Sequence, residues 1–400
     1  MQRFGAGLGA RETALAACLL AEAVALLVMA ATHPPLDLDI YAWGGHTVLR
    51  DAALYDTQAY GHWFTYPPFA AVSFIPVAAL PAVVASLLWV LVSLAATAYV
   101  CLIILRLSEV TMTPARVMLT IAVALPLEPV RHTFALGQVN LLLMALVFWD
   151  LSRLQRGDRA GMGIGIAAAI KLTPALFVVV LLVTRRFRDA AVAMGTFLVC
   201  TSLGFVVAPA ASANYWSHLF YDTNRVGAPY ISNQSPFGAA ARLLGGKQHV
   251  GQWYLAIPLA VCVVGMFAAR HYARRNDWLG AAGVTGITML LVSPISWTHH
   301  WVWLLPGIAV VARKRGILRQ GGLICIGVIL VAAPLWWTPH HGGPREYGLH
   351  GATSLVANSY LIVGVLVLAC LVLDAVRAAN QPQTPALTRS PPRPAAEMAT

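Results

Sequence analysis

The chain has 400 residues, of which 58% are hydrophobic and 11% are charged. Soluble domains carry about a quarter charged residues, so this composition excludes an ordinary soluble enzyme and indicates a polytopic membrane protein. The formal net charge is +11. The basic residues are scattered between apolar runs and are not gathered on one domain, which argues against a nucleic-acid-binding protein.

The first apolar run covers residues 13–31. It contains Glu22 and leads to His33-Pro34-Pro35 without a small-residue cleavage site, so we interpret it as a retained helix and not as a signal peptide. The six cysteines lie in apolar runs without metal-ligand spacing, so we expect neither disulfides nor a zinc site. Ten further apolar runs lie near residues 83–105, 117–127, 137–149, 161–184, 190–208, 252–269, 279–294, 301–312, 321–337 and 357–376.

Residues 36–68 form the first long polar insertion and read LDLDIYAWGGHTVLRDAALYDTQAYGHWFTYPP. Carboxylates interleaved with aromatic rings favour a polyol ligand, although an ordinary ordered surface loop is the alternative. Asp37 and Asp39 would share a face on an extended segment and diverge on a helix. A carboxylate beside apolar helices readily acquires a raised pKa and can act as a general base.

Two short stretches follow. Residues 69–80 are too few to span a bilayer comfortably, so we expect an outer-face or re-entrant helix. Arg131 and His132 precede Gly137-Gln138-Val139-Asn140, which enters a later apolar run. Amides and a cation at a helix start favour an anion or sugar hydroxyls, and hydrogen bonding of Gln138 and Asn140 between helices is the alternative.

Residues 161–184 contain Lys171-Leu172-Thr173-Pro174 in the middle of an apolar run. Basic residues on both sides of the run should be cytoplasmic, so one straight helix would place them on opposite faces. Pro174 lacks an amide donor and clashes with the preceding turn. We therefore predict two short arms, 161–171 and 175–184, which bring Lys171 toward the outer side, where it suits a lipid phosphate. A single helix with Lys171 buried and paired is the alternative.

With this break the sequence predicts about twelve membrane segments, including short or broken ones, with both termini inside the cell. Residues 1–377 form one membrane domain, and loops 32–82, 210–250 and 338–356 lie on the outer face. Residues 378–400 are rich in Pro, Thr and Ala, so we expect a disordered cytoplasmic tail. All but seven of the 27 Lys and Arg residues are then cytoplasmic, and the exceptions are Arg50, Arg131, Lys171, Arg225, Arg242, Lys247 and Arg345.

The stretch SPISWTHHW, residues 293–301, interrupts two apolar runs on the expected outer side. Adjacent histidines point in different directions, so His299 and His300 are not expected to bind one metal ion. One of them would instead hydrogen-bond a carboxylate or a phosphate. The alternative is a belt of interfacial Trp and His side chains.

Five stretches, read together and in this order, resemble the actinobacterial polyprenyl-phosphate-mannose-dependent α-(1→2)-mannosyltransferases. They are FTYPPF (64–69), GQVNLLL (137–143), AAIKLTP (168–174), NQS (233–235) and SPISWTHHW (293–301). The resemblance covers roughly residues 37–303. It implies an all-α polytopic membrane protein with the GT-C glycosyltransferase fold, and a transferase that acts on the outer face of the plasma membrane.

The resemblance also implies the chemistry of the site. The family's catalytic Asp begins a D-L-x-[VI]-Y stretch, which matches Asp37 here, and a His of the SWxHHW stretch is implied near it, with His300 preferred to His299. Inverting transfer of mannose from a polyprenyl-phosphate donor to a mannosylated lipid needs no metal and no cofactor by this logic. The expected donor-phosphate ligands are Lys171, Arg131 and Arg225, and the expected substrate-binding residues are Asp39, Tyr41, Tyr66, Gln138, Asn140, Asn233, Gln234, Trp297 and His299.

Two other classes compete with this interpretation. The first is a related GT-C enzyme that uses polyprenyl-phosphate arabinose. Sequence alone distinguishes the two donor sugars poorly, although the motifs favour mannose. A lipid-linked sugar flippase should show inverted repeats, and the sequence shows none.

Overall fold

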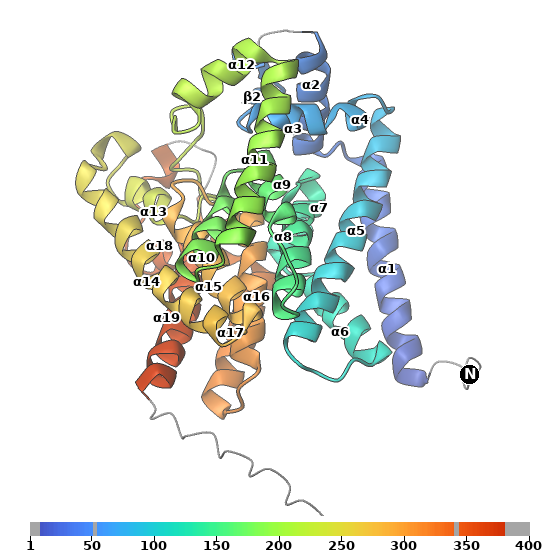
Figure 1. The fold of residues 1–400 in the computed structure, drawn as a ribbon, viewed down its shortest axis with the longest axis vertical. Coiled ribbons are helices and arrows are strands. Elements are labelled where there is room, and N and C mark those ends of the chain that lie inside the picture. Colours follow the sequence, from blue (N-terminus) through green and yellow to red (C-terminus); the bar gives the residue numbers. More distant parts are fainter. Residues whose placement is uncertain (1–8, 51–53, 340–343, 381–400) are drawn as a thin grey trace, which may run out of the picture.

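The computed structural model describes residues 9–50, 54–339 and 344–380 (Figure 1). Helices form nearly all of its regular structure, and the strands of the described residues are the hairpin of β1 (Gln58–Ala59) and β2 (His62–Trp63). Within these described ranges, five helical stretches are long and apolar enough to cross a membrane. The prediction of an all-α polytopic membrane protein is confirmed. The five stretches are α1 (Ala10–Thr32), α5 (Ala82–Leu107), α11 (Phe187–Val207), Gln252–Arg274, which joins η4 (Gln252–Leu255) to α14 (Ala256–Arg274), and α19 (Ser359–Asn380).

Several further apolar helices are shorter or bent. The pair α7 (Glu128–Leu136) and α8 (Asn140–Gln155) is bent by 117°. At this bend Gly137 adopts a left-handed φ of 67°, and a Cβ there would lie 2.7 Å from the Cβ of Leu38, so glycine is required on both counts. The number of spans stays a prediction. The short apolar helices are α6 (Pro114–Ala124), α10 (Leu176–Val183) with its preceding turn, α15 (Trp278–Val292) and α17 (Ile317–Ala332).

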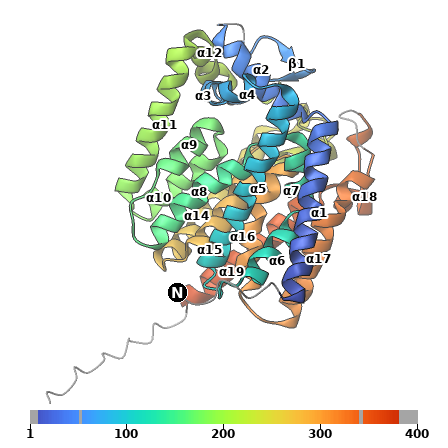
Figure 2. The ribbon, with the colours of Figure 1, turned by 90° about the vertical axis from the view of Figure 1, so that its right-hand side faces the viewer.

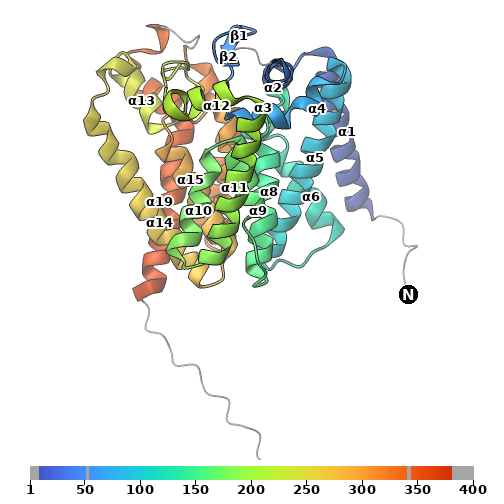
Figure 3. The same cartoon turned by 45° about the horizontal axis from the view of Figure 1, so that its top comes forward.

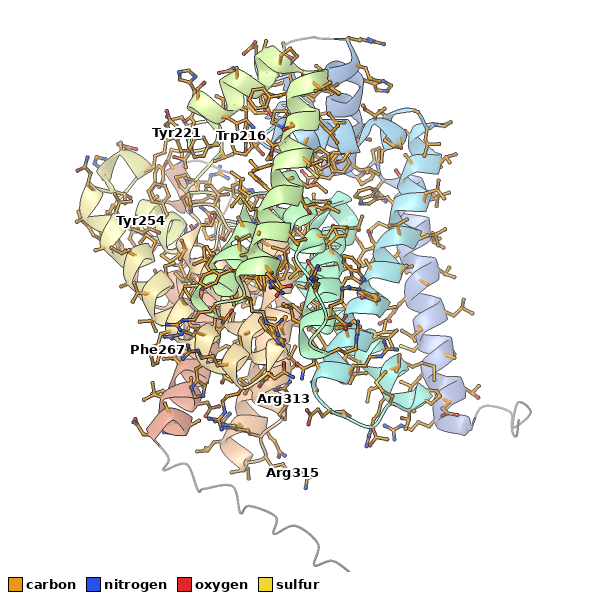
Figure 4. All side chains as sticks on the ribbon, viewed as in Figure 1. Trp216, Tyr221, Tyr254, Phe267, Arg313 and Arg315 are labelled. Atoms are coloured by element: carbon orange, nitrogen blue, oxygen red, sulfur yellow. The ribbon has the colours of Figure 1, made fainter. Side chains whose placement is uncertain are left out.

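The axes of the long helices lie in roughly the same direction, and α1 begins at the end of the molecule where α19 finishes (Figure 1). The opposite end carries the short elements around the polar insertions, as Figure 3 shows with that end turned forward. Arg313 and Arg315 lie toward the first end, whereas Trp216 and Tyr221 lie toward the second (Figure 4). We call the second end the α2 end. Its elements include α2 (Leu36–Leu49), α3 (Pro68–Ser73), α4 (Ile75–Ala78), α12 (Pro209–Asn214), η2 (Tyr215–Leu219) and α13 (Pro236–Leu243).

The first half of the expected outer loop is a helix. Pro35 precedes α2, and Asp37 and Asp39 occupy its first turn, where carboxylates stabilise the positive end of the helix dipole. The interpretation of this part as an ordinary surface loop is therefore wrong. The short helix expected over residues 69–80 is present as α3 and α4, which meet at Phe74.

The break at Lys171 is confirmed. The run divides into α9 (Met162–Ile170), η1 (Thr173–Ala175) and α10, and Lys171 between them has an extended backbone. The two ends of the run meet at Asp189 in α11, because the Ala160 amide donates to its Oδ1 at 2.9 Å and Arg186 Nη1 donates to its Oδ2 at 3.3 Å. Figure 2 shows α9 and α10 beside α11. The alternative of one straight helix is wrong.

The elements not yet described belong to the second half of the chain. The described part of the C-terminal region ends with α19 at Asn380, so residues 378–380 of the expected tail are helical and residues 381–400 lie outside the described residues. The elements not yet bounded are η3 (Lys247–His249), η5 (Thr298–Leu304), α16 (Leu305–Ala312), η6 (Pro334–Trp337), η7 (Pro344–Glu346) and α18 (Gly351–Ala357).

Candidate active site

A cavity of about 880 Å³ opens among the elements of the α2 end. Its walls come from α2, the loop after β2, the bend between α7 and α8, the break at Lys171, the loop after η2 and the segment before η5. Segments far apart in the sequence therefore line one cavity. Nine of the predicted site residues line it: Asp37, Tyr41, Tyr66, Gln138, Lys171, Arg225, Trp297, His299 and His300.

Asp37 lines this cavity with its carboxylate. Gln138 Nε2 donates to its Oδ2 at 2.6 Å, and its Oδ1 accepts no hydrogen bond from the described residues. Burial raises the pKa of Asp37, while the Gln138 hydrogen bond and the charge of Lys171 oppose this rise. The side chain is therefore an ionisable acceptor held in one orientation with one oxygen free.

Asp39 does not line the cavity, and its role as a substrate-binding residue stays a prediction. Both aspartates lie on a helix, where side chains two positions apart point in directions about 200° apart. Asp37 faces inward and Asp39 faces away. Helix formation, and not the DxD spacing, decides between the two candidates.

Two tyrosines fix the orientation of Gln138. Tyr41 and Tyr66 donate to Gln138 Oε1 at 2.9 and 3.2 Å, and their hydroxyls lie 2.8 Å apart. Because both phenols donate to the amide oxygen, the amide nitrogen must face Asp37. Tyr41 is packed in place by Phe74, whose ring stacks on it with centroids 4.3 Å apart. Tyr41 and Gln138 thus orient the carboxylate.

Lys171 projects into the cavity from the helix break. Its Nζ donates to Asn140 Oδ1 at 3.1 Å, lies 2.7 Å from His300 Nε2, and sits 5.3 Å from the centroid of the Tyr66 ring. Within the described chain it forms no ion pair with a carboxylate. An ammonium with three donors and two fixed acceptors keeps one N–H for a ligand.

Asn140 itself is buried and does not line the cavity, and its role as a substrate-binding residue stays a prediction. Its Nδ2 donates to the backbone oxygen of His299 at 3.1 Å while its Oδ1 accepts from Lys171. Its role in the structure is to position these two residues.

The two histidines of the SWxHHW stretch differ in their partners. His300 Nε2 is engaged by Lys171. Both ring nitrogens of His299 are buried and find no partner in the described residues, although the ring lines the cavity. Buried polar atoms without partners are costly unless a ligand satisfies them. The unsatisfied ring nitrogens of His299 agree with its expected place among the substrate-binding residues, and the catalytic role of His300 stays a prediction.

Arg225 and Trp297 lie on other parts of the wall. The Arg225 guanidinium lies 4.3 Å from the centroid of a Trp63 ring and donates to the backbone oxygen of Tyr55. It thus ties the loop after η2 to the hairpin β1–β2. The phosphate role of Arg225 and the substrate role of Trp297 stay predictions.

Arg131 lines a second cavity and not the first, and its role at the donor phosphate stays a prediction. This second cavity, of about 430 Å³, lies between α1 and α7. Arg131 and Gln138 are separated by the bend at Gly137, so their closeness in the sequence does not put them on one wall.

Asn233 and Gln234 are fully buried and do not line the cavity, and their role as substrate-binding residues stays a prediction. Asn233 Nδ2 donates to the backbone oxygens of Ala228 and Pro294 at 2.8 and 3.0 Å. Gln234 Nε2 donates to the backbone oxygens of Ile231 and Ala357 at 2.8 and 2.7 Å. Both amides brace loops, and their hydrogen-bonding groups are used up in doing so.

Glu128 was missed by the sequence interpretation. It is 2% exposed and lies one helical turn before His132, with its Oε1 3.0 Å from His132 Nδ1. The signal was a carboxylate in an apolar stretch with a histidine four positions later, which a helix places on the same face. Among the described residues no group of three or more His, Cys, Asp and Glu side chains is arranged to hold a metal ion.

Comparison with known proteins bears on this arrangement. The chain is 34% identical over 389 residues to the polyprenol-phosphate-mannose-dependent alpha-(1-2)-phosphatidylinositol mannoside mannosyltransferase of Mycobacterium tuberculosis, covering 90% of each chain. It is 36% identical over 311 residues to the corresponding pentamannoside mannosyltransferase of the same species, covering 74% of this chain and 72% of the relative. The protein of the first name from Mycolicibacterium smegmatis is 34% identical over 359 residues, covering 82% and 81%.

The sequence profile of glycosyltransferase family 87 matches residues 64–294. This span includes Tyr66, Gln138 and Lys171 of the cavity wall. The extent of this match, together with relatives that align over most of the chain, shows that the protein belongs to glycosyltransferase family 87.

Proposed function

We propose that this protein is a polyprenyl-phosphate-mannose-dependent α-(1→2)-mannosyltransferase, which transfers mannose to the 2-hydroxyl of a mannoside carried by a lipid. The names of its relatives support the donor and the acceptor class. The observation that carries the proposal is the pairing of Asp37, with one free carboxylate oxygen, and Lys171, with one free N–H, in a single cavity.

Asp37 acts as the general base in this proposal. An alcohol is a weak nucleophile at neutral pH, so Oδ1 of Asp37 accepts the acceptor's proton as its oxygen attacks the anomeric carbon. The anomeric C–O bond breaks, and its electron pair goes to the polyprenyl phosphate. A single displacement inverts the anomeric centre, so a β-linked donor gives an α-linked product.

Lys171 stabilises the phosphate in the same step. Cleavage turns the phosphodiester monoanion into a phosphate monoester with more charge, and a cation fixed in a protein cavity stabilises that charge more than one in bulk water. Asn140 and His300 hold the ammonium before substrate binds. This preorganisation supports phosphate binding by Lys171, and Arg225 would extend the same site from the opposite loop.

The cavity would open on the outer face of the plasma membrane. The placement of Arg313 and Arg315 toward the end opposite α2 supports this orientation (Figure 4). A cysteine introduced at Gly227, in the loop after η2, should react with an impermeant thiol reagent on intact cells, and one at Gly316 should not. The reverse labelling pattern would contradict the proposed orientation.

Turnover by the purified protein tests the activity. The protein in lipid nanodiscs is incubated with radiolabelled polyprenyl-phosphate mannose and a mannosylated phosphatidylinositol acceptor. We expect a labelled product that an α-(1→2)-mannosidase releases, and none with the Asp37→Asn variant. Transfer of label from radiolabelled polyprenyl-phosphate arabinose, and none from the mannose donor, would overturn mannose as the transferred sugar. No transfer from either donor would overturn the proposed transferase activity.

A further inference from the structure

His132 lies in the wall that separates the two cavities. It lines both of them, as does Trp336. The ring is packed edge-on against His299 and Trp336, with centroids 5.7 Å away in each case. Its side chain is 24% exposed. The ring is therefore held by its neighbours and still accessible from the cavities.

A buried carboxylate fixes this ring from behind. Besides His132, Glu128 is contacted by Trp336 Nε1, which donates to Oε1 at 2.9 Å, and by the Tyr360 hydroxyl, which donates to Oε2 at 2.8 Å. His132, Trp336 and Tyr360 thus donate to the Glu128 carboxylate from three separate elements. These hydrogen bonds stabilise an anion that burial would otherwise destabilise. Glu128 is therefore a rigid support and not a free group of the cavity.

The contacts of His132 define which nitrogen faces the ligand. Nδ1 lies 3.0 Å from Glu128 Oε1 and 2.8 Å from Thr298 Oγ1. A carboxylate can only accept, so Nδ1 carries the hydrogen. Nε2 has no partner among the described residues. This is the arrangement of a carboxylate-supported imidazole whose second nitrogen is available for proton transfer.

We propose that His132, in its doubly protonated form beside Glu128, is the general acid of the glycosyl transfer, donating the proton on Nε2 to the leaving phosphate. The inference rests on the proposed function. The acceptor oxygen forms a bond to the anomeric carbon and its proton goes to Asp37 Oδ1. The anomeric C–O bond breaks toward the phosphate oxygen, which takes the proton from His132. One proton enters and one leaves the protein side chains, so charge balances, and exchange with solvent resets both groups.

The chemistry suits an imidazole. The second pKa of a phosphate monoester is about 6, so the leaving oxygen can take up a proton near neutral pH, which favours general acid catalysis. The adjacent Glu128 carboxylate stabilises positive charge on the ring. Among the described residues no cation forms an ion pair with Asp37, which leaves it the role of base.

Charged and titratable groups face His132 from every side. Their charges together set the electrostatic field at the ring. They are Glu128 and Arg131 on α7, Glu22 on α1 across the second cavity, Asp37 on α2, His299 and His300 before α16, Lys171 at the helix break, and Tyr360 on α19 behind Glu128.

The test is the pH profile of kcat and kcat/KM for His132→Gln in nanodiscs. The amide keeps a hydrogen bond to Glu128 but has no proton to give. We expect kcat to fall about 100-fold and the decline of rate on the basic side to disappear, with the donor KM little changed. Tyr360→Phe is the matched control, since it also removes one hydrogen bond to Glu128 but leaves His132 intact, and it should lower stability while keeping the basic decline.

Glu128→Gln provides a second variant should His132→Gln fail to fold, and it should lower kcat and move the basic decline to lower pH. A folded His132→Gln enzyme that keeps the wild-type kcat, or that changes only the donor KM, would overturn the proposal. An unchanged profile in Glu128→Gln would overturn it as well. Loss of transfer by the wild-type protein would instead refute the proposed function itself.

Discussion

The wall around Asp37 and the loop around Asn233 place similar polar side chains in a largely apolar chain. Around Asp37, polar atoms stay available: Asp37 Oδ1 has no partner in the described residues, Lys171 keeps an N–H, and both nitrogens of His299 are unsatisfied. Around Asn233, the amide donates to two backbone oxygens and accepts from the amides of Ser235 and Ser296.

The difference separates recognition from support. A buried amide whose donors and acceptors are all paired has nothing left to offer a substrate, and its loss leaves its partners unsatisfied. A buried group with an unpaired atom facing a cavity is stabilised only when a ligand arrives. Substitutions in the first region should therefore change kinetics, and those in the second should change stability.

The largest expected effect is that of Asp37→Asn. The amide keeps the size of the side chain but cannot accept the proton, so turnover should fall about 10²- to 10⁴-fold while the protein folds and binds donor. Asp39→Asn, on the opposite side of the same helix, is the control and should keep near-wild-type turnover. A dead Asp39→Asn beside an active Asp37→Asn would exchange the two roles.

Lys171→Ala should have the next largest effect. Loss of one charge-assisted contact costs about 1.5–3 kcal/mol, which is a factor of about 10 to 100 in donor KM or kcat/KM. The acceptor KM should change little, and Lys171→Arg should restore part of the loss because the charge survives. Donor kinetics that do not change in the alanine variant would transfer the phosphate role to Arg225.

Asn233→Ala should change stability and leave the active site alone. Unpaired buried partners cost about 1–3 kcal/mol each, so the apparent melting temperature in detergent should fall by several degrees. The kcat of the folded fraction should stay within about twofold of wild type. A loss of kcat at unchanged melting temperature would place Asn233 among the substrate-binding residues after all.

The smallest effect is a shift in pH dependence. Burial raises the pKa of Asp37 and the Gln138 hydrogen bond lowers it. The base is active when ionised, so kcat/KM should fall as pH drops through this pKa, above the ordinary value of about 3.9. Gln138→Leu removes the opposing hydrogen bond and should move this acid decline to higher pH. A decline at the same or lower pH would show that Gln138 does not support the carboxylate.

Local sequence features determined several parts of the structure. Composition alone was sufficient for the membrane class, since 58% hydrophobic residues cannot be buried in a soluble domain of this size. The break at Lys171 followed from Pro174, because a missing donor and a steric clash act within one turn. The aspartate that begins the D-L-x-[VI]-Y stretch was the one that the fold turned toward the cavity.

Tertiary contacts decided the rest. Asn233 and Gln234 looked like ligands because their partners, Pro294 and Ala357, lie about 60 and 120 residues away and carry no side-chain signal. Glu128 gained its role from Trp336 and Tyr360, more than 200 residues further along the chain. A polar side chain in an apolar chain announces itself in the sequence. Its polar atoms either hydrogen-bond within the protein or stay unpaired and available to a ligand. Which of the two happens depends on backbone and side-chain groups that only the folded chain brings within hydrogen-bond distance.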